Sequence, residues 1–444
     1  MTIVRKIDQQ TVMPFLKRTD STRQQQRTEM ECQPFFVNLA TLPPSQLDHL
    51  RQSGLLMSTE GSVDEQDLDI CLLVDRHIQY LSPVFQPTLR SQLRPSFVTL
   101  DSSRSWMIYW TLHACDLLDY KTTAEERQAM VQTLQLFFHP RDGGFGGGPG
   151  QLPHAATTYA AVMSLAILAS HERHAMDSVK NDTLQPSSSH SALHLLQQVR
   201  KPLYQWMLTL ADEQGRVRMH HDGEIDVRAT YCCIAVLSLL QLPLPLSWAN
   251  FVSACQTWEG GFGGEPGAEA HGGYTYCAIA ALQLMESTHL IDLGALCDYA
   301  SRRQLALEGG FSGRSNKLVD GCYSFWQGGA LAVVSDLLLS NDGSNDTKTS
   351  AALFDTAMLE RYILLCAQDI HGGLRDKPSK TRDFYHSCYN LSGLSIAQQY
   401  RGKSSETEDE IVVFSRHASV AATHPCYNIR NEHVQYFKSI HWQE

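Results

Sequence analysis

The chain has 444 residues, 43% of them hydrophobic, and its 36 basic and 47 acidic side chains give a formal net charge of −11. This length and composition allow a large buried core, whereas the acidic balance argues against bulk nucleic-acid binding, which favours a basic surface. No apolar run reaches the roughly 18 residues of a membrane span. The 12 cysteines, without a C-x-x-C pair or a secretory signal, indicate reduced thiols in a cytoplasmic protein.

Three parts are expected along the chain. Residues 1–95 are predicted to form an N-terminal extension, partly flexible and partly helical. Residues 96–402 contain the repeated helical pattern described below and are predicted to form one barrel domain. Residues 403–444 are predicted to form a C-terminal segment that packs on or near this barrel.

A glycine turn followed by an apolar run recurs five times. The last glycines of these turns are Gly144, Gly215, Gly261, Gly310 and Gly373. An aromatic residue stands 15 or 16 positions after each of them, at Tyr159, Tyr231, Tyr276, Phe325 and Tyr389. Five matches at this spacing indicate an internal structural repeat.

Each repeat is predicted to contain two helices of different character. Runs such as YAAVMSLAILA, from Tyr159, are apolar on nearly all sides, which is typical of buried helices. The stretch before a turn, such as ALHLLQQVRKPLYQWMLTL from Ala192, is apolar at i, i+3, i+4 and i+7, which indicates an amphipathic helix. Such hairpins must stack to bury their inner faces.

Inner helices that are apolar all round favour a closed ring over an open stack. We therefore predict an all-α fold, an α/α toroid in which six hairpins form a barrel of parallel inner helices ringed by outer helices. The sixth hairpin is expected from SRSWMIYWTLHACDLLDY, which begins at Ser103, and the helical stretch before it.

Polar residues occupy equivalent positions in these repeats. Five residues before the marker aromatics stand His154, Asp226, His271, Asp320 and Phe384. Three residues before them stand Ala156, Arg228, Gly273, Cys322 and His386. Because the inner helices are expected to be parallel, these positions should meet at one mouth of the barrel.

Asp320, Cys322 and His386 are the strongest candidates for a metal site. Cys322 and His386 are equivalent in consecutive repeats, so their side chains should lie close together. A thiolate, an imidazole and a carboxylate that leave one coordination position open are typical of catalytic zinc. The alternative is a buried cysteine and a hydrogen-bonded histidine in an ordinary core.

Two further groups of side chains should gather at the same mouth. The first could bind phosphate by charge-assisted hydrogen bonds or form ordinary surface ion pairs, and comprises Arg228, His271, Arg314, Lys317, Lys377 and Lys380. The second is aromatic and could line a cavity for a long apolar ligand or pack in the core. It comprises Trp106, Trp110, Tyr159, Tyr231, Tyr274, Tyr323, Trp326, Tyr385 and Tyr389.

The sequence resembles the farnesyltransferase β subunits of the protein prenyltransferase family. The resemblance spans roughly residues 102–429 and rests on GGFGGGPGQLPH, GEIDVRATYC, WEGGFGGEPGAEAHGGYT, EGGFSGRSNKLVDGCYSFWQ, DKPSKTRDFYHSCYNLSGLSIAQ and THPCYNI. It implies a zinc enzyme that works only with an α subunit. The implied reaction transfers farnesyl from farnesyl diphosphate to the cysteine of a C-terminal C-a-a-X protein.

The resemblance also assigns roles to individual residues. The implied zinc ligands are Asp320, Cys322 and His386. The implied diphosphate ligands are His271, Arg314, Lys317 and Tyr323, of which Lys317 and Tyr323 count with the zinc ligands as catalytic. Arg228 matches the peptide-binding end of the cavity, and the peptide side-chain pocket matches Trp106, Trp110 and Tyr385. The isoprenoid wall matches Tyr159, Tyr231, Tyr274 and Trp326.

Four positions bear on the choice of substrate. Bulky Trp106 and Tyr389 match residues that close the cavity floor, which favours farnesyl over geranylgeranyl. Asp376 matches a carboxylate that helps hold Mg²⁺ on the diphosphate. Thr157 departs from the proline common in the family and leaves the preference for the last residue of C-a-a-X open.

Two alternatives are a geranylgeranyltransferase β subunit and a non-catalytic scaffold with a structural zinc. Structural zinc usually has four protein ligands, whereas the sequence provides three. A terpene cyclase is a more distant possibility, but the acidic D-x-D-D cluster typical of those enzymes is missing from the sequence.

Overall fold

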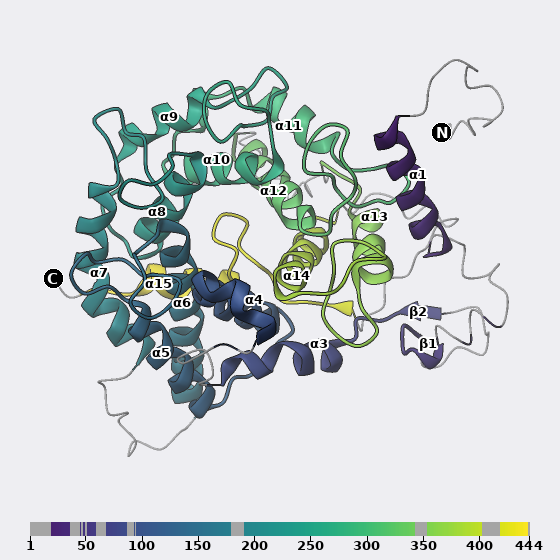
Figure 1. Cartoon of the computed structure of the whole chain (residues 1–444), viewed down its shortest axis with the longest axis horizontal. Coiled ribbons are helices and arrows are strands. Elements are labelled where there is room, and N and C mark those ends of the chain that lie inside the picture. The colour runs from purple at the N-terminus through teal and green to yellow at the C-terminus, as the bar shows by residue number, and fades with distance from the viewer. Residues whose placement is uncertain are drawn as a thin grey trace.

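Two concentric layers of helices form a ring in the computed structural model (Figure 1). The structure describes residues 19–35, 45, 48, 51–58, 68–86, 93, 95–178, 191–341, 353–401 and 418–442. The start of the predicted N-terminal extension and residues 403–417 of the predicted C-terminal segment lie outside these ranges. None of the helices in the described ranges has the length and apolar character that a membrane crossing requires.

In the described part of the chain, the inner layer contains six largely buried helices. They are α4 (Arg104–Leu117), α6 (Ala155–Ser178), α8 (Val227–Leu239), α10 (Gly272–Leu284), α12 (Tyr323–Asn341) and α14 (Phe384–Gln399). Each packs against the next, and α14 packs against α4, which closes the ring. The predicted α/α toroid of parallel inner helices is confirmed.

The outer layer precedes the inner one in each hairpin. Its helices are α3 (Val74–Leu81), α5 (Ala124–Phe137), α7 (Ala192–Thr209), α9 (Ala249–Ala254), α11 (Leu293–Ser301) and α13 (Thr356–Arg361), the last continued by a π-helical turn at Tyr362–Ala367. The expected sixth hairpin is α3 with α4. The other five hairpins follow the predicted order of outer helix, glycine turn and inner helix.

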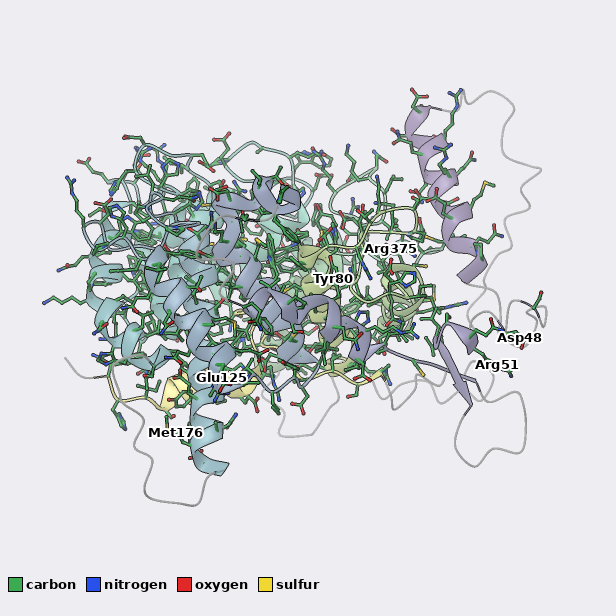
Figure 2. All side chains as sticks on the ribbon, turned by 60° about the horizontal axis from the view of Figure 1, so that its bottom comes forward. Asp48, Arg51, Tyr80, Glu125, Met176 and Arg375 are labelled. Atoms are coloured by element: carbon green, nitrogen blue, oxygen red, sulfur yellow. The ribbon has the colours of Figure 1, made fainter. Side chains whose placement is uncertain are left out.

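Smaller elements complete the described chain. Helix α1 (Asp20–Cys32) and a hairpin of β1 (Leu56–Ser58) and antiparallel β2 (Leu68–Ile70) lie outside the ring (Figure 1 and Figure 2). Short 3₁₀ turns span Gln33–Phe35, Ser82–Phe85, Pro95–Ser103, Leu246–Trp248 and Thr288–Leu290. Helix α15 (Asn431–Ser439) packs against α6 and α8.

Glycine is required where the turns meet the outer helices. Gly260 has φ +95°, and a Cβ added there would lie 2.1 Å from the carbonyl oxygen of Ala295 on α11. Gly372 has φ +88°, and its added Cβ would lie 2.0 Å from the carbonyl oxygen of Arg76 on α3. Only glycine allows both this backbone conformation and this approach, so the turns fix how consecutive hairpins pack.

Polar caps begin the inner helices at one end of the barrel. Each cap accepts a hydrogen bond from a backbone N–H two or three residues later, and the caps are His154, Asp226, His271, Asp320 and Asp383. The last differs from the predicted position, because six residues rather than five separate the cap from the aromatic in the final repeat. Phe384 is instead buried and packs against Tyr80 and Phe97.

The described part of the C-terminal segment packs on the opposite end of the barrel. The backbone N–H of Ala421 donates to the carbonyl of Leu117 at the end of α4 (2.9 Å). The N–H of Thr423 donates to the hydroxyl of Ser395 on α14 (2.8 Å). The mouth with the helix caps therefore stays open, whereas the other end is covered by the chain itself.

Candidate active site

Asp320, Cys322 and His386 converge at the open mouth. Their possible ligand atoms all lie within 4.8 Å of one another. Nε2 of His386 lies 3.3 Å from Oδ1 of Asp320, and the same oxygen accepts a hydrogen bond from the backbone N–H of Cys322 (3.0 Å). The repeat thus brings together residues separated by 64 positions, and the sulfur, nitrogen and oxygen donors suit a zinc ion.

Asp383 orients the imidazole of His386, and it was not among the predicted site residues. Its Oδ2 lies 2.6 Å from Nδ1, so Nδ1 carries the proton and Nε2 faces Asp320. A carboxylate behind a histidine in this way is the usual support of a zinc ligand. Burial lowers the pKa of His386, but hydrogen bonds to Asp320 and Asp383 outweigh it and raise the pKa to about 9.

Cys322 lies beneath the two charged residues and is 4% exposed. Burial and the nearby charge of Asp320 raise the pKa of its thiol well above the usual range. A thiol in these surroundings ionises only beside a cation, because the surrounding protein provides negative charge and little water. The thiol of Cys322 therefore stays protonated at neutral pH unless a metal cation stabilises its thiolate.

A cavity of about 690 Å³ reaches Tyr323 and Tyr385, the chain neighbours of Cys322 and His386. All nine predicted aromatic residues line it, together with Arg228, His271 and Arg314. Trp106 packs against Trp110 and Tyr159, and Trp326 packs against Tyr389 with ring centroids 4.4 Å apart. The size and the aromatic walls of the cavity suit a long apolar ligand.

Tyr323 and His271 form a hydrogen-bond donor pair at the cavity rim. Nδ1 of His271 accepts from the backbone N–H of Gly273 (3.1 Å), so in the neutral imidazole Nε2 carries the proton and donates to the Tyr323 hydroxyl (2.8 Å). Burial and the charge of Arg314 lower the pKa of His271, which favours this neutral form. The hydroxyl hydrogen of Tyr323 is then left to bind a negatively charged ligand.

Several of the predicted basic residues form ion pairs with carboxylates of the chain itself. Arg314 pairs with Glu269, Arg228 pairs with Asp226, and Lys377 pairs with Asp376. Lys317 and Lys380 are exposed, and neither forms an ion pair with another described residue. Neither Lys317 nor Asp376 lines the cavity, so a ligand would reach both only at the outer rim.

Thr157 faces away from this cavity. Its hydroxyl donates to the carbonyl of Phe145 (2.7 Å), and its side chain is not part of the lining. His154 and Met219 line the wall nearby. The substitution of the family's proline therefore changes a buried contact rather than a lining surface.

Known proteins share both the sequence and the ring of helices. A family model described as a prenyltransferase alpha-alpha toroid domain matches residues 72–429. Protein farnesyltransferase subunit beta of Arabidopsis thaliana is 36% identical over 75% of this chain and 74% of its own length. The subunit of the same name from Schizosaccharomyces pombe is 36% identical over 80% of this chain and 86% of its own length.

The chain belongs to the protein farnesyltransferase β-subunit family. The resemblance inferred from the motifs is thereby confirmed, and so is a prenyltransferase enzyme as the class of protein. A solved Candida albicans protein geranylgeranyltransferase-I structure in complex with GGPP superimposes with a TM-score of 0.62 at 21% identity, covering 83% of this chain and 99% of that one. At this identity the match supports the fold alone.

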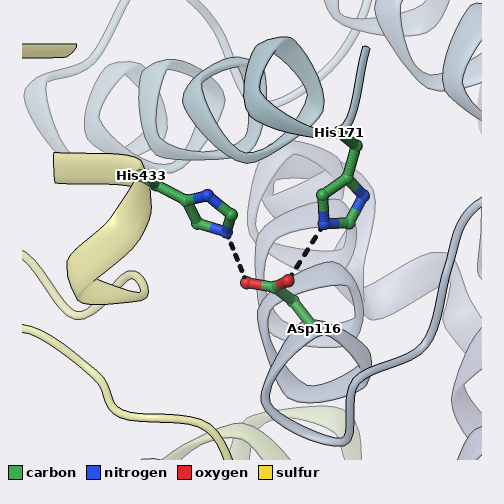
Figure 3. A group of neighbouring side chains, drawn as sticks. All are labelled: Asp116, His171 and His433. Atoms are coloured by element: carbon green, nitrogen blue, oxygen red, sulfur yellow. Dashed lines mark hydrogen bonds and ion pairs between the residues drawn. The ribbon is translucent and has the colours of Figure 1, made fainter. Parts of the chain in front are cut away.

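The chain contains a second grouping of possible metal ligands, at the covered end of the barrel. Asp116, His171 and His433 are all buried (Figure 3). The carboxylate of Asp116 lies 2.9 Å from Nε2 of His171 and 2.7 Å from Nε2 of His433, and Arg430 approaches it to 3.5 Å. Because both imidazoles and a guanidinium already satisfy the carboxylate, this grouping is a hydrogen-bonded anchor between α4, α6 and α15.

We expect Asp116→Asn to lower the free energy of unfolding by about 3 kcal/mol, the scale for breaking a buried ion pair. Burial would raise the pKa of Asp116, but His433 and His171 hold it well below the usual range. The stabilisation is therefore present above the unfolded pKa of about 3.9 and is lost in stronger acid. Urea denaturation at neutral pH measures it. Exposed Asp119, which also pairs with Arg430, is the control, and Asp119→Asn should cost less than about 1 kcal/mol.

We expect Asp383→Asn to weaken zinc binding by about 10- to 100-fold, the range for removing the support of a histidine ligand. In the metal-free protein, protons compete for His386 below its pKa of about 9. Zinc affinity should therefore rise with pH, and the part of the rise that comes from His386 should end at lower pH in Asp383→Asn, whereas the part that comes from the Cys322 thiol should be the same in both proteins.

Competition with a metal chelator across pH measures this effect. Asp292→Asn changes the cap of α11, remote from the mouth, and should leave zinc affinity unchanged. Equal zinc affinities in Asp383→Asn and the wild type would contradict the orienting role of Asp383.

Proposed function

We propose that this chain, assembled with an α subunit, transfers the farnesyl group of farnesyl diphosphate to the cysteine thiol of C-terminal C-a-a-X proteins. The observation that carries the proposal is the meeting of Asp320, Cys322 and His386 next to Tyr323 and Tyr385, which line an aromatic cavity. One end of that cavity offers hydrogen-bond donors for an anion and its walls offer rings for an isoprenoid. The cytoplasmic location expected from the sequence is part of the same proposal.

Asp320, Cys322 and His386 would hold the zinc ion. The donor set fits this metal, since it combines a buried sulfur, an imidazole oriented by Asp383 and a carboxylate. A bound zinc ion would lower the pKa of a substrate thiol and so provide a thiolate nucleophile at neutral pH. Three protein ligands would leave a position for that thiol.

The residues at the rim would bind and stabilise the diphosphate leaving group. Tyr323 can donate its hydroxyl hydrogen because His271 donates to its oxygen. Arg314 lines the same rim and exposed Lys317 lies close by in sequence. Binding that strengthens as charge develops on the leaving oxygen lowers the barrier, whereas equally strong binding of the intact donor does not.

The aromatic wall would bind the isoprenoid and exclude water from the reacting carbon. Tyr159, Tyr231, Tyr274 and Trp326 line this wall. Tyr385 packs against His386 with ring centroids 5.0 Å apart, and Trp110 packs against Tyr385 at 5.6 Å. Both rings line the cavity and would contact the side chains of the peptide. Arg228 would bind the peptide at the peptide-binding end of the cavity while it keeps part of its ion pair with Asp226.

Asp376 is the proposed protein ligand of Mg²⁺ on the diphosphate. Burial and the nearby carboxylate of Asp320 raise its pKa, which indicates an electronegative position that would favour a cation. Lys377 provides the partner in this structure, so Mg²⁺ would have to replace that contact. Oxygen ligands from a carboxylate and a diphosphate suit Mg²⁺.

We expect Asp376→Lys to reduce the dependence of the transfer rate on Mg²⁺, because a fixed ammonium group would replace the cation. The rate is measured against Mg²⁺ concentration with the co-expressed α subunit. Asp376→Asn is the control, since it removes the negative charge without supplying a positive one, and it should weaken Mg²⁺ binding without replacing it. An unchanged Mg²⁺ response in Asp376→Lys would remove Asp376 from the proposed site.

The proposed function is tested by co-expressing the chain with an α subunit and offering a C-a-a-X peptide with each of two donors. Transfer should be faster from farnesyl diphosphate than from geranylgeranyl diphosphate, and it should require zinc. The chain without the α subunit should be inactive. Faster transfer from geranylgeranyl diphosphate would instead support a geranylgeranyltransferase β subunit, and no transfer from either donor would favour a scaffold.

A further inference from the structure

Four tyrosines on four neighbouring inner helices bind one segment of the C-terminal chain. These tyrosines, which we call the tyrosine ladder, are at most 3% exposed and come from α4, α6, α8 and α10. Each hydroxyl donates to one of four consecutive backbone carbonyls. The pairs are Tyr109 to Asn428 (2.6 Å), Tyr159 to Tyr427 (2.8 Å), Tyr231 to Cys426 (3.0 Å) and Tyr276 to Pro425 (2.8 Å).

The accepting segment, residues 424–429, is a closed turn that we call the plug. Figure 1 shows the C-terminal loop, in yellow, inside the ring of helices. Thr423 and Arg430 pair across its base, and Nδ1 of His424 accepts from the backbone N–H of Cys426 (3.1 Å). The plug therefore has a defined shape, and its four carbonyls point at the surrounding helices.

Both ends of the plug are fixed to the barrel. Before it, Thr423 binds Ser395 on α14. After it, His433 binds Asp116 on α4 in the buried anchor. A segment fixed on both sides presents acceptors at set positions, so a hydroxyl that donates to one of them fixes the orientation of its own ring.

Two members of the ladder are also part of the cavity wall. Tyr159 and Tyr231 line the cavity, whereas Tyr109 and Tyr276 do not. Tyr159 packs on Trp106, with ring centroids 5.7 Å apart, and Tyr231 packs on Tyr159 at 5.5 Å. The plug thus supports the far wall of the cavity from behind.

We propose that the plug limits the depth of the prenyl cavity by fixing the rings of Tyr159 and Tyr231 through their hydroxyls. The C-terminal segment is then a positioning element that helps exclude prenyl chains longer than farnesyl. This inference rests on the proposed function, since it concerns the same cavity. Without its hydroxyl bond a buried ring is held by packing alone, so it can tilt toward the plug and lengthen the cavity.

The ladder can act in this way at neutral pH because its hydroxyls are protonated. Burial raises the pKa of all four tyrosines. Each hydroxyl therefore has a hydrogen to donate to its carbonyl. Substitution by phenylalanine removes this donor and keeps the ring, which separates the positioning role of the hydroxyl from the bulk of the side chain.

The test compares two matched double variants in the complex with the α subunit. Tyr159→Phe/Tyr231→Phe removes the two hydroxyls on lining rings, and Tyr109→Phe/Tyr276→Phe removes the two on rings behind the wall. Each variant loses two hydrogen bonds to the plug, so their thermal unfolding temperatures should change by similar amounts. Calorimetry measures the dissociation constants of farnesyl and geranylgeranyl diphosphate for each, and neither value depends on transfer.

In Tyr159→Phe/Tyr231→Phe, the affinity for geranylgeranyl diphosphate relative to farnesyl diphosphate should rise about tenfold, the scale of two lost hydrogen bonds. In the control, Tyr109→Phe/Tyr276→Phe, the same ratio should rise less than about twofold. Each single variant, Tyr159→Phe or Tyr231→Phe, should show part of the rise. An unchanged ratio in the lining variants, or an equal rise in both pairs, would overturn the positioning role. A selective rise without peptide prenylation by the wild type would support that role and contradict the proposed function instead.

Discussion

Replacing Cys322 by alanine is expected to lower zinc affinity and the rate of prenyl transfer by at least about 100-fold each, because the loss of a direct ligand should exceed the 10- to 100-fold effect of losing its support. The wild type should contain about one zinc ion per chain, as a three-ligand catalytic site predicts. The variant keeps the two charged residues but loses the only sulfur among the three converging side chains. Elemental analysis of the purified complex and a single-turnover assay measure the two effects.

Cys233→Ala is the matched control for this variant. Cys233 is fully buried in α8 and lies outside the metal grouping. Replacing Cys233 by alanine also removes one buried sulfur and leaves a cavity of similar size in the core. Because this sulfur is not a candidate ligand, zinc content and turnover should be preserved. Full zinc content in Cys322→Ala would contradict the ligand assignment, and a loss of zinc in Cys233→Ala would indicate that instability causes the effect.

Replacing Trp106 by alanine is expected to change the donor preference more than any other single change in the cavity. A buried CH₂ group is worth about 0.8 kcal/mol, so five further carbons would gain about 4 kcal/mol if they had room. Preference for farnesyl must therefore come from steric exclusion. Trp106 lies between Trp110 and Tyr159 in the wall, and its removal should admit the longer chain.

The ratio of kcat/KM for geranylgeranyl over farnesyl diphosphate should rise at least about tenfold in Trp106→Ala, with a ceiling of about 1000-fold from the area gained. Trp258→Ala is the control, because its indole is 95% exposed and lies outside the cavity. Competition between the two donors in one reaction measures the ratio directly. An unchanged ratio in Trp106→Ala would show that another part of the wall limits the chain length.

Regular spacing made the ring and the meeting of the three candidate metal ligands predictable. Each marker aromatic stands 15 or 16 residues after its glycine turn, so equivalent positions meet at one mouth once the inner helices are parallel. Cys322 and His386 could be paired on this basis alone. Asp383 was missed because the one-residue difference in the last repeat moves the cap away from the counted position, and a search that allowed this shift would have found it.

The contacts at the covered end of the barrel could not be predicted in the same way. Tyr109 and Asn428 are 319 positions apart, and the acceptor is a backbone carbonyl, which every residue has. The anchor at Asp116 likewise joins three helices whose proximity follows only from the closed ring. At the mouth, the pairing of Arg314 with Glu269 was missed because a surface carboxylate has no positional signature.

X-ray absorption at the zinc edge of the purified complex tests most directly whether Asp320, Cys322 and His386 bind the metal that activates the substrate thiol. We predict one sulfur ligand per zinc in the resting protein, and a second sulfur when a C-a-a-X peptide and a non-reactive farnesyl diphosphate analogue are added. A resting zinc without sulfur, or a sulfur count that does not change when the peptide binds, would contradict the account.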